Sequence, residues 1–189
     1  MASSNTDRRL DAHENDLYST PVEGLKAMER FIKKGSRLLD PCAGLGDMSN
    51  HFKGLGHFVF TSDLYNYGAE LGIEIDFLKV NKNDLPKNID TVIMNPPFTL
   101  TLEFVDKALE LYDHVVMFNR MSILEGQARG KKFTSKEWCL KHCDIFSYRV
   151  SCTKGVDREP TNNAVAYAVY EFDKSFKGTP TLGWITKEG

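Results

Sequence analysis

Short runs rich in β-branched and aromatic residues alternate along this chain with segments whose apolar residues recur at helical spacing. Parallel strands need crossover connections, and right-handed crossovers place helices on both faces of one sheet. The pattern therefore predicts an α/β fold with a doubly wound, mostly parallel sheet. Helical spacing is clearest at residues 22–32 and 104–111, and Thr101 is expected to cap the second of these helices. The predicted strands are Arg37–Asp40, His57–Asp63, Ile73–Phe77, Thr91–Asn95, His114–Asn119, Ile145–Ser151 and Ala164–Phe172.

The last two predicted strands are joined by a loop, Cys152–Asn163, that shows no helical pattern. Strands joined without a crossover helix pair antiparallel. The sheet is therefore expected to end in an antiparallel terminal hairpin. In open sheets of this kind, ligands bind at the carboxyl ends of the strands, near the point where the strand order reverses. Residues that directly follow strands are thus the first candidates for function.

Composition fits one folded globular domain. Of the 189 residues, 41% are apolar and 26% charged; residues 15–189 are predicted to form a single domain and residues 1–14 a flexible N-terminal arm. The longest apolar run, Ala164–Tyr170, is far shorter than the roughly 18 residues of a membrane span. The first twenty residues lack the apolar core of a secretory signal, and four cysteines without such a signal favour free thiols in the cytoplasm.

A glycine-containing turn follows the strand at 37–40, in Asp40-Pro41-Cys42-Ala43-Gly44-Leu45-Gly46. Gly44 and Gly46 let a ligand approach bare backbone, and the helix that follows offers unpaired N–H groups. These features are typical of a site for a nucleoside-type ligand. Because a glycine pair is also common in tight turns, the interpretation depends on the neighbouring strand ends.

Acidic residues end the next two predicted strands. Asp63, followed by Leu64, can accept hydrogen bonds from both hydroxyls of a ribose. Asp76 can accept a hydrogen bond from an adenine amino group, with Phe77 covering the ring. Each has a simpler alternative, since Asp63 could cap a turn and Asp76 could lie in a solvated loop.

The most specific motif is Asn95-Pro96-Pro97-Phe98, which directly follows an apolar strand. The prolines fix the backbone and remove two N–H donors, leaving the Asn95 side-chain oxygen and the Pro96 carbonyl as rigid, neutral acceptors. Such acceptors suit methylation of an exocyclic amino group, because an aromatic amine is a poor nucleophile until its lone pair is withdrawn from the ring. Phe98 can stack on the planar group that carries the amine. The alternative is a strand terminator with Phe98 in the core.

A basic segment follows the strand predicted at 114–119. Residues 119–141 hold six basic and two acidic side chains, a local net charge of +4, although the whole chain has a net charge of −2. The molecule is therefore not a general polycation, and nucleic acid would have to bind at a local patch. The alternative is a solvated helix surface. The candidates for contacts with nucleic-acid phosphates are Arg120, Arg129, Lys131 and Lys132.

Cys139 and Cys143 lie four residues apart in a segment expected to be helical. Two thiols at this spacing could hold a metal ion only with further ligands from elsewhere in the chain. We therefore predict buried thiols and no metal site.

The order of these motifs resembles the adenine-specific (N6) DNA methyltransferases, and among them the small phage-type members. The segment Asn15-Asp16-Leu17-Tyr18-Ser19-Thr20-Pro21 and residues 120–129 and 164–185 are similar to that family as well. The resemblance implies a class I methyltransferase-like, Rossmann-like sheet of seven strands, S-adenosyl-L-methionine as cofactor and DNA as partner. The chain is too short for the separate target-recognition region of the larger members, so the resemblance gives no recognition sequence.

The resemblance also assigns roles to particular residues. The catalytic site for the target adenine would consist of Asn95, Pro96, Pro97 and Phe98. The cofactor-binding residues would be Tyr18, Thr20, Pro21, Asp40, Pro41, Cys42, Ala43, Gly44, Gly46, Asp63, Leu64, Asp76 and Phe77.

Other functions stay open at this point. Asn-Pro-Pro-aromatic motifs also occur in methyltransferases that act on RNA bases and on glutamine side chains of proteins. The basic segment favours nucleic acid over protein, but it does not separate DNA from RNA. A non-catalytic decoy that sequesters the cofactor is a further alternative, against which the intact Asn95 and Phe98 argue.

Overall fold

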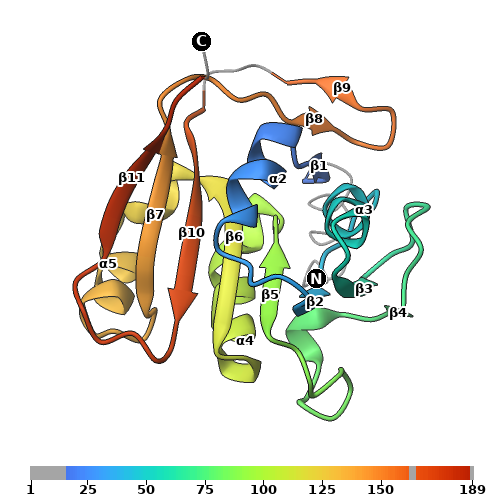
Figure 1. Ribbon diagram of the computed structural model, residues 1–189, viewed down its shortest axis with the longest axis horizontal. Coiled ribbons are helices and arrows are strands. Elements are labelled where there is room, and N and C mark those ends of the chain that lie inside the picture. Colours follow the sequence, from blue (N-terminus) through green and yellow to red (C-terminus); the bar gives the residue numbers. More distant parts are fainter. Residues whose placement is uncertain (1–15, 162–164, 188–189) are drawn as a thin grey trace, which may run out of the picture.

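A computed structural model describes residues 16–161 and 165–187, so the arm predicted at residues 1–14 lies outside the described residues. Within these ranges, eight strands form one sheet in the order β11-β7-β10-β6-β5-β2-β3-β4 (Figure 1). Their bounds are β2 Arg37–Asp40, β3 Phe58–Asp63, β4 Ile73–Glu74, β5 Thr91–Met94, β6 His114–Arg120, β7 Leu140–Phe146, β10 Tyr167–Asp173 and β11 Thr181–Ile185.

The expected pairing is confirmed. Strands β2 to β6 pair in parallel, and β10 pairs antiparallel with both β6 and β7. The sheet has one strand more than the seven expected, because β11 adds to the outer edge and pairs in parallel with β7. Strand order reverses between β2 and β5, since β3 continues the sheet on one side and β5 on the other. This reversal is where a ligand site is expected.

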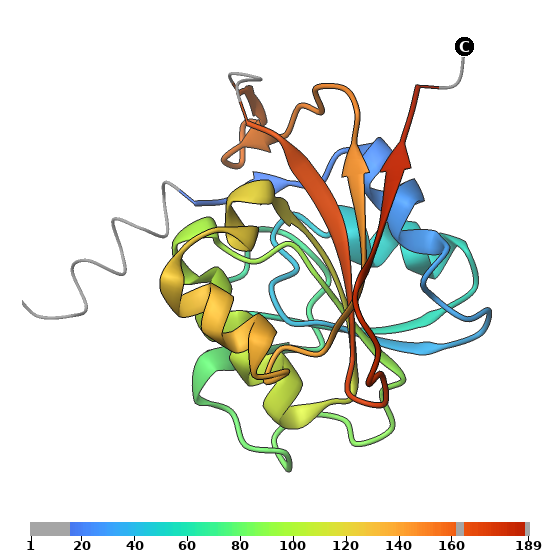
Figure 2. The same cartoon turned by 90° about the vertical axis from the view of Figure 1, so that its left-hand side faces the viewer.

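Helices cover both faces of the sheet, as Figure 2 shows edge-on. Leu38 and Leu39 of β2 point to opposite faces because side chains alternate along a strand. Leu38 joins the core formed with α2 and α3, whereas Leu39 joins the core formed with α4. The helices are α2 Val22–Glu29, α3 Asp47–Gly54, α4 Thr101–Leu111 and α5 Gln127–Thr134, with 3-10 turns η1 Phe77–Lys79, η2 Phe98–Leu100 and η3 Met121–Leu124.

The prediction of a strand at Ile145–Ser151, preceded by a helix that contains Cys139 and Cys143, is wrong. Residues 140–146 form β7, and the chain leaves the sheet after Phe146. Charged side chains obscure the strand in the sequence, yet they are paired in the structure. Asp144, which is 1% exposed, accepts a 2.7 Å hydrogen bond from Arg30.

The loop predicted at residues 152–163 contains a small hairpin. Its strands are β8 Thr153–Lys154 and β9 Glu159–Pro160, and β8 pairs antiparallel with β1, Tyr18–Ser19. Arg158, next to β9, forms two hydrogen bonds of 2.8 and 3.0 Å with the carboxylate of Asp47, the first residue of α3. The hairpin therefore links residues 18–19 to the start of α3.

All four cysteines are free thiols, and Cys143 and Cys152 are buried. Over residues 16–161 and 165–187, no helix is long and apolar enough to cross a membrane. The same residues hold no group of three or more His, Cys, Asp or Glu side chains arranged to bind a metal ion.

Candidate functional site

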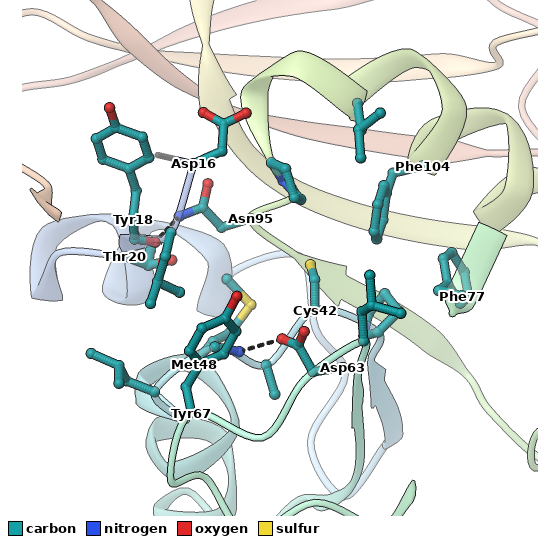
Figure 3. A pocket seen from close by; sticks show the side chains of 18 of the residues that line it. Asp16, Tyr18, Thr20, Cys42, Met48, Asp63, Tyr67, Phe77, Asn95 and Phe104 are labelled. Atoms are coloured by element: carbon teal, nitrogen blue, oxygen red, sulfur yellow. Dashed lines mark hydrogen bonds between the residues drawn. The ribbon is translucent and has the colours of Figure 1, made fainter. Parts of the chain in front are cut away.

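A cavity of about 480 Å³ lies at the carboxyl ends of β2, β3 and β5, where the strand order reverses (Figure 3). Ten of the thirteen predicted cofactor-binding residues line it, as do Asn95 and Pro97 of the four predicted catalytic residues. The ten are Tyr18, Thr20, Pro41, Cys42, Ala43, Gly44, Asp63, Leu64, Asp76 and Phe77.

The turn after β2 forms one wall of this cavity. Gly44 and Gly46 have φ of 55° and 84°, in the left-handed region that favours glycine. A Cβ atom on Gly44 would lie 3.1 Å from a methyl group of Leu17. At Gly44 the turn therefore presents bare backbone, and it continues directly into α3, whose N-cap is Gly46.

Asp63, at the end of β3, links the turn to the neighbouring strand. Its Oδ2 accepts a 2.8 Å hydrogen bond from the backbone N–H of Gly44, and its Oδ1 accepts one of 3.3 Å from Tyr65. The interpretation of Asp63 as a turn cap is therefore confirmed. The same carboxylate lines the cavity, and its role toward a ribose stays a prediction. Figure 3 shows it facing the cavity beside Cys42 and Tyr67.

Three predicted cofactor residues lie outside the lining. Asp40 is 1% exposed behind the turn and accepts a 2.7 Å hydrogen bond from the Ser49 hydroxyl. Burial, with a smaller contribution from the charge of Asp63, raises the pKa of Asp40 to about 7. Gly46 shapes the turn, and Pro21 lines a separate shallow depression beside Arg158.

The far end of the cavity is aromatic. Asp76 accepts a 3.1 Å hydrogen bond from the N–H of Leu78 and so caps η1, while its carboxylate pairs with Lys79 at 3.0 Å. Phe77 is buried against Phe104 of α4, with ring centroids 5.5 Å apart. Figure 3 places both rings at this end.

Sequence reasoning missed several lining residues. Leu100, Glu103 and Phe104 come from η2 and α4, and Tyr67 comes from the loop after β3. In the sequence, Phe104 belongs to the apolar spacing of a core-facing helix, which gives no sign of a second role. Burial and the nearby charge of Asp63 raise the pKa of Tyr67, so its hydroxyl stays protonated at neutral pH.

Residues 16–20, here called the strap, line one side of the cavity and are held by hydrogen bonds on both of their flanks. Asp16 accepts hydrogen bonds of 2.9 and 2.6 Å from the backbone N–H and the hydroxyl of Thr99. The Tyr18 carbonyl accepts one of 3.0 Å from the Asn95 side chain. On the other side, Gly155 of the β8–β9 hairpin donates a 2.8 Å hydrogen bond to the Leu17 carbonyl.

The Asn-Pro-Pro-Phe motif lies at the end of β5. Because the Asn95 amide nitrogen donates to a carbonyl, its oxygen must point the other way. This Oδ1 is buried and has no hydrogen-bond partner among the described residues. Pro96, the next residue, is buried. Thr101, expected to cap α4, does not do so; its hydroxyl lies within 3.4 Å of the Pro97 carbonyl and accepts from Asn119 at 3.2 Å.

Phe98 does not line the cavity. Its ring lies 4.9 Å from the Tyr18 ring and 6.1 Å from the Tyr167 ring, between centroids. The guanidinium carbon of Arg120 is 3.8 Å from the centroid of Phe98. Phe98 thus belongs to an aromatic cluster beside Asn95 and is covered by a cation.

The predicted phosphate-binding residues are dispersed. Arg120 packs on Phe98, and the Arg129 side chain donates to the Glu125 carbonyl. Lys132 is held by two carboxylates, those of Asp106 at 2.8 Å and Glu137 at 2.6 Å. Lys131 is exposed on α5. The structure therefore does not bring these four side chains together at the cavity.

No protein-family model matches the chain. A candidate ribosomal RNA large subunit methyltransferase of Methanocaldococcus jannaschii is 33% identical to it over 122 residues, which cover 54% of this chain. The chain spans 29% of the length of that relative.

Solved structures resemble most of this fold. A candidate RNA methyltransferase from Pyrococcus horikoshii aligns with a TM-score of 0.57 and 21% identity, over 83% of this chain and 86% of that chain. A TehB-like S-adenosylmethionine-dependent methyltransferase from Corynebacterium glutamicum aligns with a TM-score of 0.53 and 16% identity, over 89% of this chain and 94% of that chain. The chain therefore has the fold of the class I S-adenosylmethionine-dependent methyltransferases.

Proposed function

We propose that this protein is an S-adenosylmethionine-dependent methyltransferase that modifies the exocyclic N6 amino group of adenine in DNA. The observation that carries the proposal is Asn95. It lines the cavity at the carboxyl end of β5, and its amide is held in one orientation by the Tyr18 carbonyl. Its Oδ1 is a buried acceptor without a partner among the described residues. A buried acceptor left unpaired is costly, and an amino group would satisfy it.

The cavity fits the cofactor that this fold implies. Five carboxylates line it, and within the described residues no lysine or arginine does. S-adenosylmethionine carries a sulfonium and an amino group, so an acidic lining favours it. The bare turn at Gly44, the carboxylate of Asp63 and the aromatic end at Phe77 would hold its methionine, ribose and adenine parts respectively. When bound, the cofactor supplies the methyl group.

The chain's own residues would position the target amine. Asn95 Oδ1 and the Pro96 carbonyl would accept hydrogen bonds from the two N–H groups of the amine. These hydrogen bonds would withdraw the nitrogen lone pair from the ring, so no charged base is required. The prolines on either side of this carbonyl keep it rigid. The strap forms part of the cavity wall and is held in place by Asn95 and Thr99. Most of the rate enhancement would then come from positioning.

The test is to express the protein and its Asn95→Ala variant in a methylation-deficient host, and to digest total DNA and RNA to nucleosides for mass spectrometry. Excess N6-methyladenine in DNA that disappears with the variant supports the proposal. Calorimetry with S-adenosylhomocysteine should show that the variant still binds the cofactor product. Loss of binding together with activity would indicate a structural role for Asn95. Unchanged methylation in the variant would contradict its assigned role.

A second candidate is adenine in RNA. The curated relative and one of the solved structures are both named as RNA methyltransferases. The same digestion separates the two candidates, because the methylated nucleoside appears as a ribonucleoside in one case and a deoxyribonucleoside in the other.

A further inference from the structure

Arg120 is the last residue of β6, and its backbone is firmly held. Its N–H donates to the Asn119 side chain at 2.8 Å, and its carbonyl accepts from the Tyr170 hydroxyl at 3.1 Å. Residue 120 also pairs with Tyr167 across the sheet. The Cα–Cβ direction of Arg120 is therefore fixed by the sheet, and only its long side chain is free to choose a position.

That side chain lies in an aromatic cluster and not in solvent. Its guanidinium carbon is 3.8 Å from the ring centroid of Phe98 and 5.6 Å from that of Tyr18. The Tyr167 ring belongs to the same cluster, with its centroid 6.1 Å from that of Phe98. Arg120 Nε is buried and has no hydrogen-bond partner among the described residues. A planar cation thus stacks on Phe98 although one of its N–H groups is unsatisfied.

The ring that Arg120 covers is Phe98, the last residue of the Asn-Pro-Pro-Phe motif. Phe98 would stack on the target base, so this inference rests on the proposed function. Phe98 has little free surface for a base. Tyr18 packs on it with rings tilted by 41°, which leaves no parallel slot on that side, and Arg120 covers it at van der Waals distance. A base can stack on Phe98 only if one of these side chains leaves. The Tyr18 backbone is fixed by Asn95 and by β8, whereas the guanidinium ends a flexible side chain.

We propose that Arg120 is a placeholder for the target base: its guanidinium occupies the stacking position on Phe98 in the free protein and is displaced when a planar heteroaromatic base enters. The guanidinium is planar and stacks on aromatic faces, so it resembles part of a base in shape. It keeps water off Phe98 until the base arrives. Displacement frees the unsatisfied Nε–H to find a partner, which offsets the loss of the cation–π contact.

The proposal makes a prediction with a definite sign. A residue that contacts the base strengthens base binding, so removing it weakens that binding; removing a placeholder strengthens it. Free adenine is a suitable probe because it has no phosphate to interact with the charge of Arg120. S-adenosylhomocysteine is added in excess so that its own adenine fills the cofactor end of the cavity. Binding is followed by NMR on the ring resonances of Phe98.

We expect Arg120→Ala to bind adenine about five- to tenfold more tightly than the unaltered protein, with shifts at Phe98. Arg120→Lys keeps the charge but loses the planar stack, so its affinity should lie between the two. Phe98→Leu in the Arg120→Ala background should abolish the gain. In the unaltered protein, the Arg120 Hδ protons should resonate upfield because of the Phe98 ring current and should return downfield as adenine is added.

Weaker or unchanged adenine binding by Arg120→Ala would overturn the placeholder role, as would Arg120 Hδ resonances that stay upfield in the adenine complex. If Arg120→Ala does not fold, the Hδ shifts of the unaltered protein decide the question. Failure of the proposed function is seen separately, as absence of methylated nucleosides in the digest, because adenine binding requires no methyl transfer.

Discussion

The side-chain amide of Asn95 donates a 3.0 Å hydrogen bond to the backbone carbonyl of Tyr18, 77 residues earlier in the chain. This single contact fixes two things. It orients the Asn95 amide so that Oδ1 is the free acceptor, and it holds the strap against the side of the cavity. The orientation of the Asn95 amide and the position of the strap are therefore coupled through one side chain.

Asn95→Asp tests this coupling. A carboxylate of the same shape cannot donate to the Tyr18 carbonyl and places a negative charge beside it. We expect loss of methyl transfer and faster amide hydrogen exchange at residues 16–20. The matched control is Asn66→Asp, because within the described residues the Asn66 side-chain oxygen accepts a hydrogen bond from Gly68 and aspartate keeps that acceptor. Unchanged exchange in the strap of Asn95→Asp would show that the coupling is absent.

Thr99→Val tests the other attachment of the strap. The substitution removes the hydroxyl that donates to Asp16 at 2.6 Å and leaves the backbone donor in place. Loss of one hydrogen bond costs about 0.5–1.5 kcal/mol, so affinity for S-adenosylhomocysteine should fall roughly three- to tenfold. Calorimetry measures this change. Thr134→Val removes a comparable exposed hydroxyl from α5, and its affinity should match that of the unaltered protein; an equal loss in both variants would argue against the strap.

The sequence predicts the central strands well, because each buried parallel strand reads as a continuous apolar run. Predicted and observed bounds differ by at most one residue at β2, β3, β5 and β6. The outer strands are harder to predict. In β7, Asp144 and Lys141 interrupt the pattern. Buried Asp144 pairs with Arg30, and partly exposed Lys141 pairs with Glu171; both partners are distant in sequence.

The sequence predicts those residues of the site that directly follow a strand. Asp63 and Asn95 are found this way because the topology brings carboxyl ends of parallel strands together. Phe104 is missed, since one helical face serves both the core and the cavity. No sequence pattern indicates the contact of Arg120 with Phe98, because it depends on how closely the ends of β6 and β5 lie in the folded sheet.

Asp40 should make stability depend on pH. Its native pKa of about 7 lies above the ordinary value of 3.8, so between these pH values the native state binds more protons than the unfolded state. The stability that this group contributes is complete below about pH 4 and is lost as the pH rises to 7. Asp40→Asn removes the cost of ionisation and can still accept from Ser49. At pH 8 the variant should therefore be more stable, by at most about 4 kcal/mol.

Urea unfolding at pH 5 and pH 8 measures this effect. The stability difference between Asp40→Asn and the unaltered protein should increase from pH 5 to pH 8. Asp113→Asn is the control, because Asp113 is a surface aspartate whose side chain is 88% exposed. If Asp40→Asn and the unaltered protein show the same change from pH 5 to pH 8, Asp40 does not carry a raised pKa.

The two adjacent lysines of α5 should behave differently. Lys132 is held by Asp106 and Glu137, and these hydrogen bonds raise the pKa of its ammonium group. Because the pair is partly exposed, Lys132→Ala should cost at most about 1 kcal/mol of stability and leave nucleic-acid affinity nearly unchanged.

Lys131 is exposed, so Lys131→Ala should leave stability unchanged. If α5 contacts duplex DNA, the same substitution should make the negative slope of log affinity against log salt shallower by about 0.9. Filter binding over a salt series and urea unfolding of both variants separate the two roles, and equal salt slopes for Lys131→Ala and the unaltered protein would remove α5 from the interface.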